Sequence, residues 1–362
     1  MSRLVFVTQR VDADDPVLGF VTGWIRALAR RFDEVVVIAT RTGTIPPDLG
    51  ATVRSLDDPP TRRRAARGVR YQRHLASVCR HRPDALLAHM CPVYLNQAVP
   101  ITELMRVPRL LWFAHPSSRP SVRLAARMSQ VVLTSLPSAF PLDAAPGRVR
   151  VIGQAIDIDR FPLREVPPKD DELRLLTLGR TSPVKGLPTI IRAVGRLVAD
   201  GRPVSLRIVG PATTEPERHH RLELERLVER EGLGGRIRID PPVTHDEMPR
   251  LLASAHALVN ATASGSGDKV VFEAMATGRP VVASNTAMRE LVGGLELRLD
   301  FDEGDDRDLA NRLTTLAAGS REELAAIGER LRARVVGAHS LDGWANQVAE
   351  VVEELRGRSR QR

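Results

Sequence analysis

The chain has 362 residues, of which 43% are hydrophobic and 27% are charged, a composition typical of a soluble globular protein long enough for two domains. No apolar run approaches the ~20 residues that a membrane-spanning helix needs. Because the first residues enter a strand pattern directly, we expect no signal peptide. The two cysteines, Cys79 and Cys91, lack a metal-type spacing, which favours a reduced, cytoplasmic setting.

The positive charge of the chain is concentrated in its first half. Residues 1–165 hold 24 Lys and Arg against 14 Asp and Glu, a balance of +10, whereas the remaining residues hold 29 against 30. A basic surface predicts an anionic partner, either a membrane surface, a phosphorylated acceptor or nucleic acid; a solvated arginine-rich surface is the alternative. Nucleic acid is the least favoured partner, because only 4% of the residues are aromatic and no stacking platform is evident.

Apolar strands alternate with amphipathic helices along the first half of the chain. Such alternation favours a parallel sheet that is covered on both faces. The arginine-rich helical stretch at 61–75 carries its charges around the whole helix, which is more typical of a solvated surface than of a binding site. The predicted strands are 3–7, 34–40, 51–56, 85–89, 109–115, 130–135 and 148–153, and the predicted helices include 20–32 and 121–128.

The stretch 159–174 is proline-rich and charged without periodicity, and is predicted to be a linker. The alternation of strands and helices then begins again. The predicted strands are 173–179, 204–210, 236–242, 256–261, 280–284 and 297–301, and the predicted helices are 187–201, 217–232, 245–255, 269–278 and several from about 306 onward, the last being 341–357.

The sequence therefore predicts an α/β protein with two Rossmann-like, doubly wound parallel-sheet domains facing a cleft. We place the N-terminal domain at residues 1–165 and the C-terminal domain at 166–340, followed by a helix at 341–362. In such sheets ligands bind at the carboxyl ends of the strands, so the cleft is the expected site.

The segment LTLGRTSPVKGLPTII predicts a phosphate site. A strand ends at Gly179 and a helix begins near Gly186, with Arg180 and Lys185 beside the loop between them. Helix N-terminal amides and two cations suit a diphosphate; an ordinary strand-to-helix turn with surface cations is the alternative. Only three of the 53 cationic residues are lysines, and a compact ammonium suits a cramped phosphate site.

The segment SGSGDKVVFEAMATGRPVVAS predicts a second part of the site. Its glycines let the backbone approach a ligand closely. Glu273 lies one turn inside the helix that follows, and a carboxylate in this setting commonly binds a ribose. An exposed helical glutamate is the alternative, which the apolar neighbours of Glu273 disfavour.

Two features of the first half are weaker candidates. His115 ends the predicted strand 109–115 and is followed by proline; His89 ends the strand 85–89 in a similar way and is its rival. Gly19 lies in a loop before the first helix, where it permits close backbone approach, although an ordinary helix start explains it equally well.

The order of these motifs resembles that of the retaining GT-B glycosyltransferases of family four (glycosyltransferase group 1). The segment GRTSPVKG is similar to the family's Gly-Arg…Lys-Gly loop, FEAMATGRPVVAS to its Glu-Ala-Met-Ala signature, and TQRVDADDPVLGF to the opening of bacterial polysaccharide-assembly members. The last helix, with Trp344, resembles the one that crosses back to the N-terminal domain in this family.

The resemblance implies specific roles for the candidate residues. Arg180 and Lys185 would bind the donor diphosphate and stabilise it as it leaves, which is also what fixed positive charge at a departing anion would do. His115 would meet the transferring sugar, and Gly19 would belong to the loop that closes over the donor. The implied donor-binding set is Gly19, Gly179, Arg180, Lys185, Gly265, Ser266, Gly267, Asp268, Lys269, Val270 and Glu273, with no metal and no cofactor.

The chain departs from the family pattern at one position. The family pairs two glutamates with seven residues between them, and eight positions before Glu273 stands Gly265. Asp268 is the remaining carboxylate of this loop. It either caps the following helix or, together with the amides of residues 265–268, replaces the missing glutamate toward the donor sugar, while Lys269 contacts the diphosphate.

We therefore expect a metal-independent, retaining hexosyltransferase of glycan or glycoconjugate biosynthesis. The donor would be a UDP- or GDP-linked sugar, and the acceptor a glycan, a lipid-linked sugar or a small molecule. An epimerase-like nucleotide-sugar enzyme of the same fold and a catalytically inactive nucleotide-binding partner of an active transferase are the alternatives. The expected location is the cytoplasm, with peripheral contact to an anionic membrane at its inner face.

Overall fold

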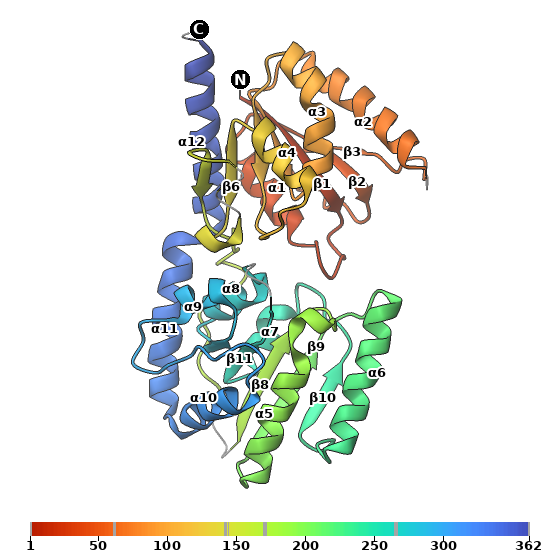
Figure 1. Cartoon of the computed structure of the whole chain (residues 1–362). Helices are drawn as coiled ribbons and strands as arrows, with labels where there is room; N and C mark the ends of the chain where they lie inside the picture. Colours follow the sequence, from red (N-terminus) through yellow and green to blue (C-terminus); the bar gives the residue numbers. More distant parts are fainter. Residues whose placement is uncertain are drawn as a thin grey trace. The chain divides into compact units, whose positions relative to one another are not determined.

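The computed structural model describes residues 2–60, 63–140, 143, 145–168, 172–263 and 267–360. The chain divides into two compact units (Figure 1). Unit 1 comprises Met1–Asp157 and His339–Arg362, and unit 2 comprises Ile158–Ala338. Unit 1 is thus discontinuous in the sequence, because the whole of unit 2 is inserted before its last helix.

Unit 1 is built on a seven-stranded parallel sheet with the order β3-β2-β1-β4-β5-β6-β7. Its central strands are buried along nearly their whole length, as helices cover both faces of the sheet. The strand order reverses between β1 and β4, which makes this the switch point of a doubly wound sheet. The strands are β1 (Arg3–Val11), β2 (Glu34–Thr42), β3 (Thr52–Ser55), β4 (Ala85–His89), β5 (Arg109–Trp112), β6 (Val131–Thr134) and β7 (Val149–Val151).

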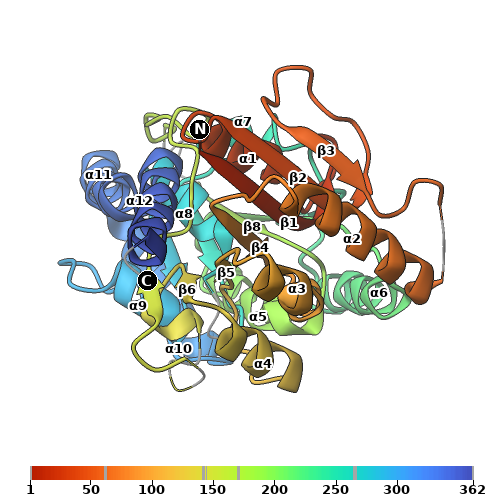
Figure 2. The same ribbon diagram turned by 90° about the horizontal axis from the view of Figure 1, so that it is seen from above.

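The helices of unit 1 form two layers, with α2, α3 and α4 side by side on one face of the sheet and α1 with α12 on the other (Figure 2). Trp24 of α1 packs on Trp344 of α12, with ring centroids 4.5 Å apart. Cys79 and Cys91 are buried and unpaired, and burial raises the pKa of both thiols. The helices are α1 (Val21–Ala29), α2 (Arg64–Cys79), α3 (Pro92–Leu104), α4 (Pro120–Met128), the short η1 (Pro137–Ala139) and α12 (Leu341–Arg360).

Unit 2 contains a five-stranded parallel sheet with the order β10-β9-β8-β11-β12. Here the order reverses between β8 and β11, which pair through Leu175 with Ala257 and Leu176 with Leu258. The predicted strand 297–301 contributes only a single bridge, from Asp300 to Ala283. The strands are β8 (Leu173–Leu178), β9 (Val204–Val209), β10 (Ile237–Asp240), β11 (Ala257–Asn260) and β12 (Val281–Ala283).

The helices of unit 2 also pack in two groups. Helix α5 lies against α6 and α10, while α11 lies against α8 and α9. The two parallel sheets with their helical layers confirm the predicted α/β fold with two Rossmann-like domains. The helices are η3 (Pro183–Lys185), α5 (Leu187–Ala199), α6 (Glu215–Arg230), α7 (Met248–Ala253), α8 (Lys269–Ala276), α9 (Thr286–Val292), α10 (Asp306–Ala318) and α11 (Arg321–Ala338).

The boundary between the units lies at Asp157, eight residues before the position expected from the sequence. Arginine side chains attach the following segment to unit 2. Arg279 donates to the carbonyls of Arg164 and Glu165, and Arg332 donates to the carbonyl of Phe161. The first part of the predicted linker thus belongs to unit 2, and its backbone carbonyls accept the hydrogen bonds that attach it there.

Candidate functional site

The switch point of the unit 2 sheet brings the two predicted motifs into contact. The loop after β8 runs through Gly179, and the loop after β11 begins at Ala261. The two loops touch directly, because the amide of Ala263 donates to the carbonyl of Val184 at 2.9 Å. Ligands bind at this point of open α/β sheets, so the strand order alone makes it the candidate site.

Lys185 and Asp268 form an ion pair at the centre of this site. Both side chains are largely buried, with exposed fractions of 15% and 16%. The same carboxylate oxygen, Oδ2 of Asp268, also accepts from Asn260 Nδ2 at 2.9 Å and from Thr262 Oγ1 at 3.1 Å. Burial by itself would raise the pKa of Asp268, but the charge and hydrogen bond of Lys185, with those from Asn260 and Thr262, lower it overall.

This geometry contradicts the alternative that the side chain of Asp268 caps the following helix. Asp268 occupies the N-cap position of α8 with an extended backbone, yet its side chain makes no capping hydrogen bond with the described residues. The carboxylate points instead to Lys185, 83 positions away in the sequence. The role of Asp268 toward a donor sugar stays a prediction.

Two glycines allow Lys185 to reach this position. At Gly179, with φ of +130°, an added Cβ would lie 3.1 Å from Cε of Lys185, so the lysine side chain runs over the glycine. At Gly186, with φ of +58°, an added Cβ would lie 2.4 Å from the carbonyl oxygen of Ala261. Glycine at 186 therefore serves both the left-handed backbone and the close contact between the two loops.

Arg180 is held by a carboxylate that the sequence analysis missed. Its Nη1 lies 3.1 Å from Oε1 of Glu217, which is 6% exposed. Glu217 also accepts from Thr213 and closes a capping box with Thr214 at the start of α6. Burial opposes ionisation of Glu217, but these hydrogen bonds and the charge of Arg180 lower its pKa. The spacing Thr214-x-x-Glu217 is itself the sequence signature of a capping box.

Glu273 is buried, with an exposed fraction of 3%. Its Oε1 lies 3.7 Å from Nζ of Lys269, one turn earlier in α8, and 3.5 Å from Nε2 of His245. This burial contradicts the alternative of an exposed helical glutamate. His245, whose ring packs edge-on against Phe161, was not among the predicted site residues, and nothing in its sequence context distinguishes it.

Three cation–carboxylate pairs thus gather at one end of one sheet: Arg180–Glu217, Lys185–Asp268 and Lys269–Glu273. Paired charges keep the cations oriented in a partly buried place, and a bound anion can add to or replace each carboxylate. Val270 lies in the first turn of α8 and Gly267 just before it, both partly exposed, whereas Gly265 and Ser266 lie outside the described residues.

The unit 1 candidate Gly19 lies in the loop after β1, beside the switch point of that sheet. Its amide donates to the carbonyl of Asp15 at 2.9 Å, and an added Cβ would lie 2.7 Å from the same oxygen. The carboxylate of Asp15 accepts from the amides of Val17 and Leu18. A side chain at position 19 would clash with the backbone of this turn, so the turn requires glycine.

The two histidine candidates differ in surroundings. Strand β5 ends at Trp112, three residues earlier than predicted, because its ladder to β4 ends at the pair His89–Trp112. His115 therefore lies beyond the strand, in the loop after β5, where partial desolvation and the charge of Arg119 lower its pKa. His89 is 3% exposed, faces Thr8 at 3.0 Å and stacks on Phe6, as expected of a core histidine.

The part of the chain that the structure describes contains no cluster of three metal-ligating side chains. Searched over the same residues, no helix has the length and hydropathy to cross a bilayer.

Comparison with protein families matches residues 172–318 to the family described as glycosyl transferases group 1. This range contains all three cation–carboxylate pairs. A D-inositol 3-phosphate glycosyltransferase of Nocardioides sp. is 30% identical over 235 residues, which are 59% of this chain and 49% of that protein. One of the same name from Streptomyces griseus is 31% identical over 183 residues, 42% of this chain and 38% of that protein. The chain spans about half the length, or less, of these curated relatives.

Solved structures resemble the chain over nearly its full length. HepE of Anabaena, in complex with UDP and glucose, has a TM-score of 0.76 and 18% identity, covering 98% of this chain and 100% of that one. Sucrose-phosphate synthase of Thermosynechococcus elongatus has a TM-score of 0.76 and 16% identity, covering 99% and 100%. At such identities the likeness establishes the two-domain fold. Residues 172–318 are thus similar to the glycosyl transferases group 1 family, and the chain as a whole shares the fold of these solved structures.

Proposed function

We propose that the chain is a retaining glycosyltransferase that moves a sugar from a nucleotide diphosphate sugar to an acceptor, without a metal ion. The observation that carries the proposal is the convergence of Arg180, Lys185 and Lys269 at the switch point of the unit 2 sheet. Fixed cations at this place suit the charge that develops on a departing diphosphate, and stabilising that charge lowers the barrier to transfer.

Each pair has a distinct role in this proposal. Lys185 and Arg180 bind the diphosphate, Lys185 as a point charge and Arg180 as a planar fork. The buried carboxylate of Glu273 accepts from the ribose hydroxyls. Asp268 holds Lys185 in place before the donor arrives and then accepts from a hydroxyl of the donor sugar. The amides of residues 265–268 complete that contact, and His115 and Gly19 act from unit 1.

UDP-linked sugars are the first donors to test, since HepE of Anabaena is a structural neighbour that binds UDP and UDP-glucose; GDP-linked sugars come second. The curated relatives are named for transfer to D-inositol 3-phosphate. Together with the +10 balance of residues 1–165, this favours an anionic acceptor: a phosphorylated small molecule, a lipid-linked sugar or a glycan. The reaction would then belong to glycan or glycoconjugate assembly at the inner face of the membrane, in the cytoplasm.

The first experiment measures donor binding. A thermal-shift panel of nucleotide diphosphates and their sugars should raise the unfolding temperature of the full chain, because a ligand that binds only the folded state stabilises it. Lys185→Ala should abolish the shift from UDP but not any shift from uridine. Arg192→Ala, on the exposed face of α5, is the matched control and should leave both unchanged. A panel without any shift would contradict donor binding.

The second experiment follows turnover of the donor that binds. NMR of the product should show the anomeric configuration of the donor, and a chelator should leave the rate unchanged. Inversion at the anomeric carbon, or activity that is lost in chelator and restored by magnesium, would overturn those parts of the proposal. Conversion of the donor without any acceptor would favour the epimerase-like alternative, and binding without turnover the inactive partner.

A further inference from the structure

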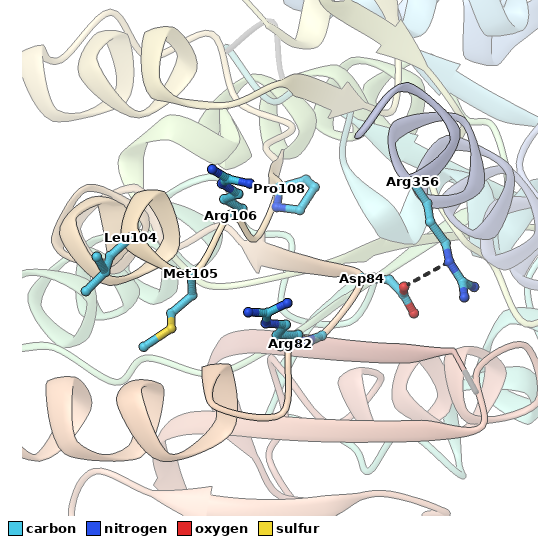
Figure 3. A pocket seen from close by; sticks show the side chains of 8 residues that line it. Arg82, Asp84, Leu104, Met105, Arg106, Pro108 and Arg356 are labelled. Atoms are coloured by element: carbon cyan, nitrogen blue, oxygen red, sulfur yellow. Dashed lines mark ion pairs between the residues drawn. The ribbon is translucent and has the colours of Figure 1, made fainter. Parts of the chain in front are cut away.

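Unit 1 carries a basic hollow at the amino ends of its strands. The loop of Gly19 lies at the other end of the sheet, where the strands finish. The hollow has a volume of about 550 Å³. Three separate chain segments form it: the loop before β4, the end of α3 with the start of β5, and the last helix α12 (Figure 3). Its lining residues are Arg82, Pro83, Asp84, Leu104, Met105, Arg106, Pro108 and Arg356.

A second hollow of about 880 Å³ adjoins the first and shares Arg106 and Pro108 with it. It adds the guanidinium groups of Arg127 and Arg148. The two together form what we call the arginine hollow. Its lining is strongly positive, and the volume of each of the two hollows lies in the range of small-ligand sites.

The carboxylates in the arginine hollow are already engaged. Asp84 accepts from the backbone amide of Arg3 at 2.8 Å and pairs with Arg356 at 3.4 Å. Glu103 pairs with the buried Arg109 at 2.5 Å. These two acids therefore do not neutralise the remaining arginines.

Three guanidinium groups of the arginine hollow have no carboxylate partner among the described residues. Within the described part of the chain, the side chains of Arg82, Arg106 and Arg127 make no ion pair and no hydrogen bond. All three residues are exposed. Because guanidinium groups form paired hydrogen bonds with phosphate oxygens, this lining fits a phosphate-bearing ligand.

The backbone gives an independent reason to assign a use to Arg82 and Arg106. Each follows the end of a helix, α2 or α3, with a left-handed conformation, φ being 47° and 55° respectively. Glycine is the usual residue at such positions, because a side chain is disfavoured there. Two arginines that line the same hollow thus occupy strained positions, where glycine would fold more easily.

We propose that the arginine hollow binds a phosphate-bearing group, either a lipid headgroup or a soluble diphosphate. The site is separate from the donor site, which lies in unit 2, and it does not depend on the proposed transferase activity. Arg82 and Arg106 contact the phosphate oxygens, and Arg127 and Arg148 add positive charge around them.

The double variant Arg82→Gly/Arg106→Gly tests the proposal. It removes both charges and also relieves the left-handed strain, so its unfolding temperature should equal or exceed that of the wild type. Inorganic pyrophosphate is titrated into the full chain with the donor site saturated by UDP. Separately, sedimentation measures binding to phosphatidylcholine vesicles with and without phosphatidic acid. We expect wild-type binding in at least one arm, weakened at least tenfold in the variant.

The matched control, Arg64→Gln/Arg73→Gln, removes two exposed charges from α2 in the same unit. It should weaken binding less than threefold. Pyrophosphate binding would identify a site for a soluble ligand, and binding to phosphatidic acid vesicles alone would identify a headgroup site. The proposal is overturned if the wild type binds neither, or if the control loses as much binding as the glycine variant. UDP binding, measured separately, should be the same in all three proteins, so a failure of the donor site is distinguishable.

Discussion

Replacing Asp268 with asparagine tests the central contact of the candidate site. In the structure one oxygen of this carboxylate accepts from Lys185, Asn260 and Thr262. Asparagine has nearly the same shape and can still accept from the last two residues. The substitution therefore removes the negative charge opposite Lys185 and little else.

The size of the effect follows from burial. A hydrogen bond to a charged group contributes about 1.5–3 kcal/mol. Lys185 would keep its charge with an exposed side-chain fraction of only 15%, so solvent would compensate poorly. We expect Asp268→Asn to lower the free energy of unfolding of unit 2 by about 1.5–3 kcal/mol, a decrease of roughly 3–12 °C in its unfolding temperature.

Calorimetry of the full chain at several pH values measures this effect. Because the pKa of Asp268 is lowered in the folded state, its contribution is present above the unfolded value near 3.8 and is lost as the pH falls through the folded pKa. The difference between wild type and variant should therefore be constant near neutral pH and shrink below about pH 4.

A matched control separates the ion pair from the general effect of losing an acid. Asp302→Asn breaks an exposed ion pair with Arg289 in the same unit, in which the side chain of Asp302 is 66% exposed. This substitution should lower the free energy of unfolding by less than about 1 kcal/mol. Equal effects of the two substitutions, or a pH-independent difference for Asp268→Asn, would refute the reasoning. Turnover should also fall, by roughly ten- to a hundredfold, if Asp268 accepts from the donor sugar.

Three further substitutions have defined outcomes. Gly186→Ala should destabilise unit 2 by at least about 2 kcal/mol in chemical denaturation, through its left-handed backbone and the contact with Ala261; an unchanged midpoint would contradict the glycine argument. Glu217→Ala should lower the free energy of unfolding by about 2 kcal/mol in the same measurement, because it removes the capping box of α6 and the partner of Arg180. A decrease below about 0.5 kcal/mol would be too small for the loss of these contacts. Burial lowers the pKa of His339 to about 4, so the free energy of unfolding of unit 1 should fall by up to about 3 kcal/mol between pH 6.5 and pH 4. His339→Gln should make this free energy less dependent on pH. An unaltered pH profile would exclude the histidine as the source of the dependence.

Much of the fold could be predicted from the sequence because its signals are local. Apolar strands alternating with helices indicate a parallel sheet, and glycines at Gly179 and Gly186 indicate where the chain must turn. The end of a strand was harder to predict from the sequence. Strand β5 ends at Trp112 because its ladder with β4 ends there. Whether His89 or His115 is buried depends on this tertiary pairing.

The pairing of charges in the site depends on strand order, which the sequence does not state. Lys185 and Asp268 meet only because β8 and β11 are neighbours. The contact of Arg180 with Glu217 likewise requires the loops after β8 and β9 to be adjacent. The motifs identified the three cations and the carboxylates Asp268 and Glu273, but Glu217 and the pairing of each cation with its carboxylate became visible only in three dimensions.

The insertion of unit 2 before α12 has a consequence for the order of synthesis. Unit 1 lacks its last helix until the end of the chain emerges, so Trp24 stays without Trp344, and the backbone of Ile156 without its bonds to His339 and Leu341. At roughly 5–20 residues per second, translation of the remaining ~200 residues takes on the order of 10–40 s. During that interval unit 2 can fold as a continuous segment, while the nascent unit 1 exposes an apolar face that chaperones can recognise.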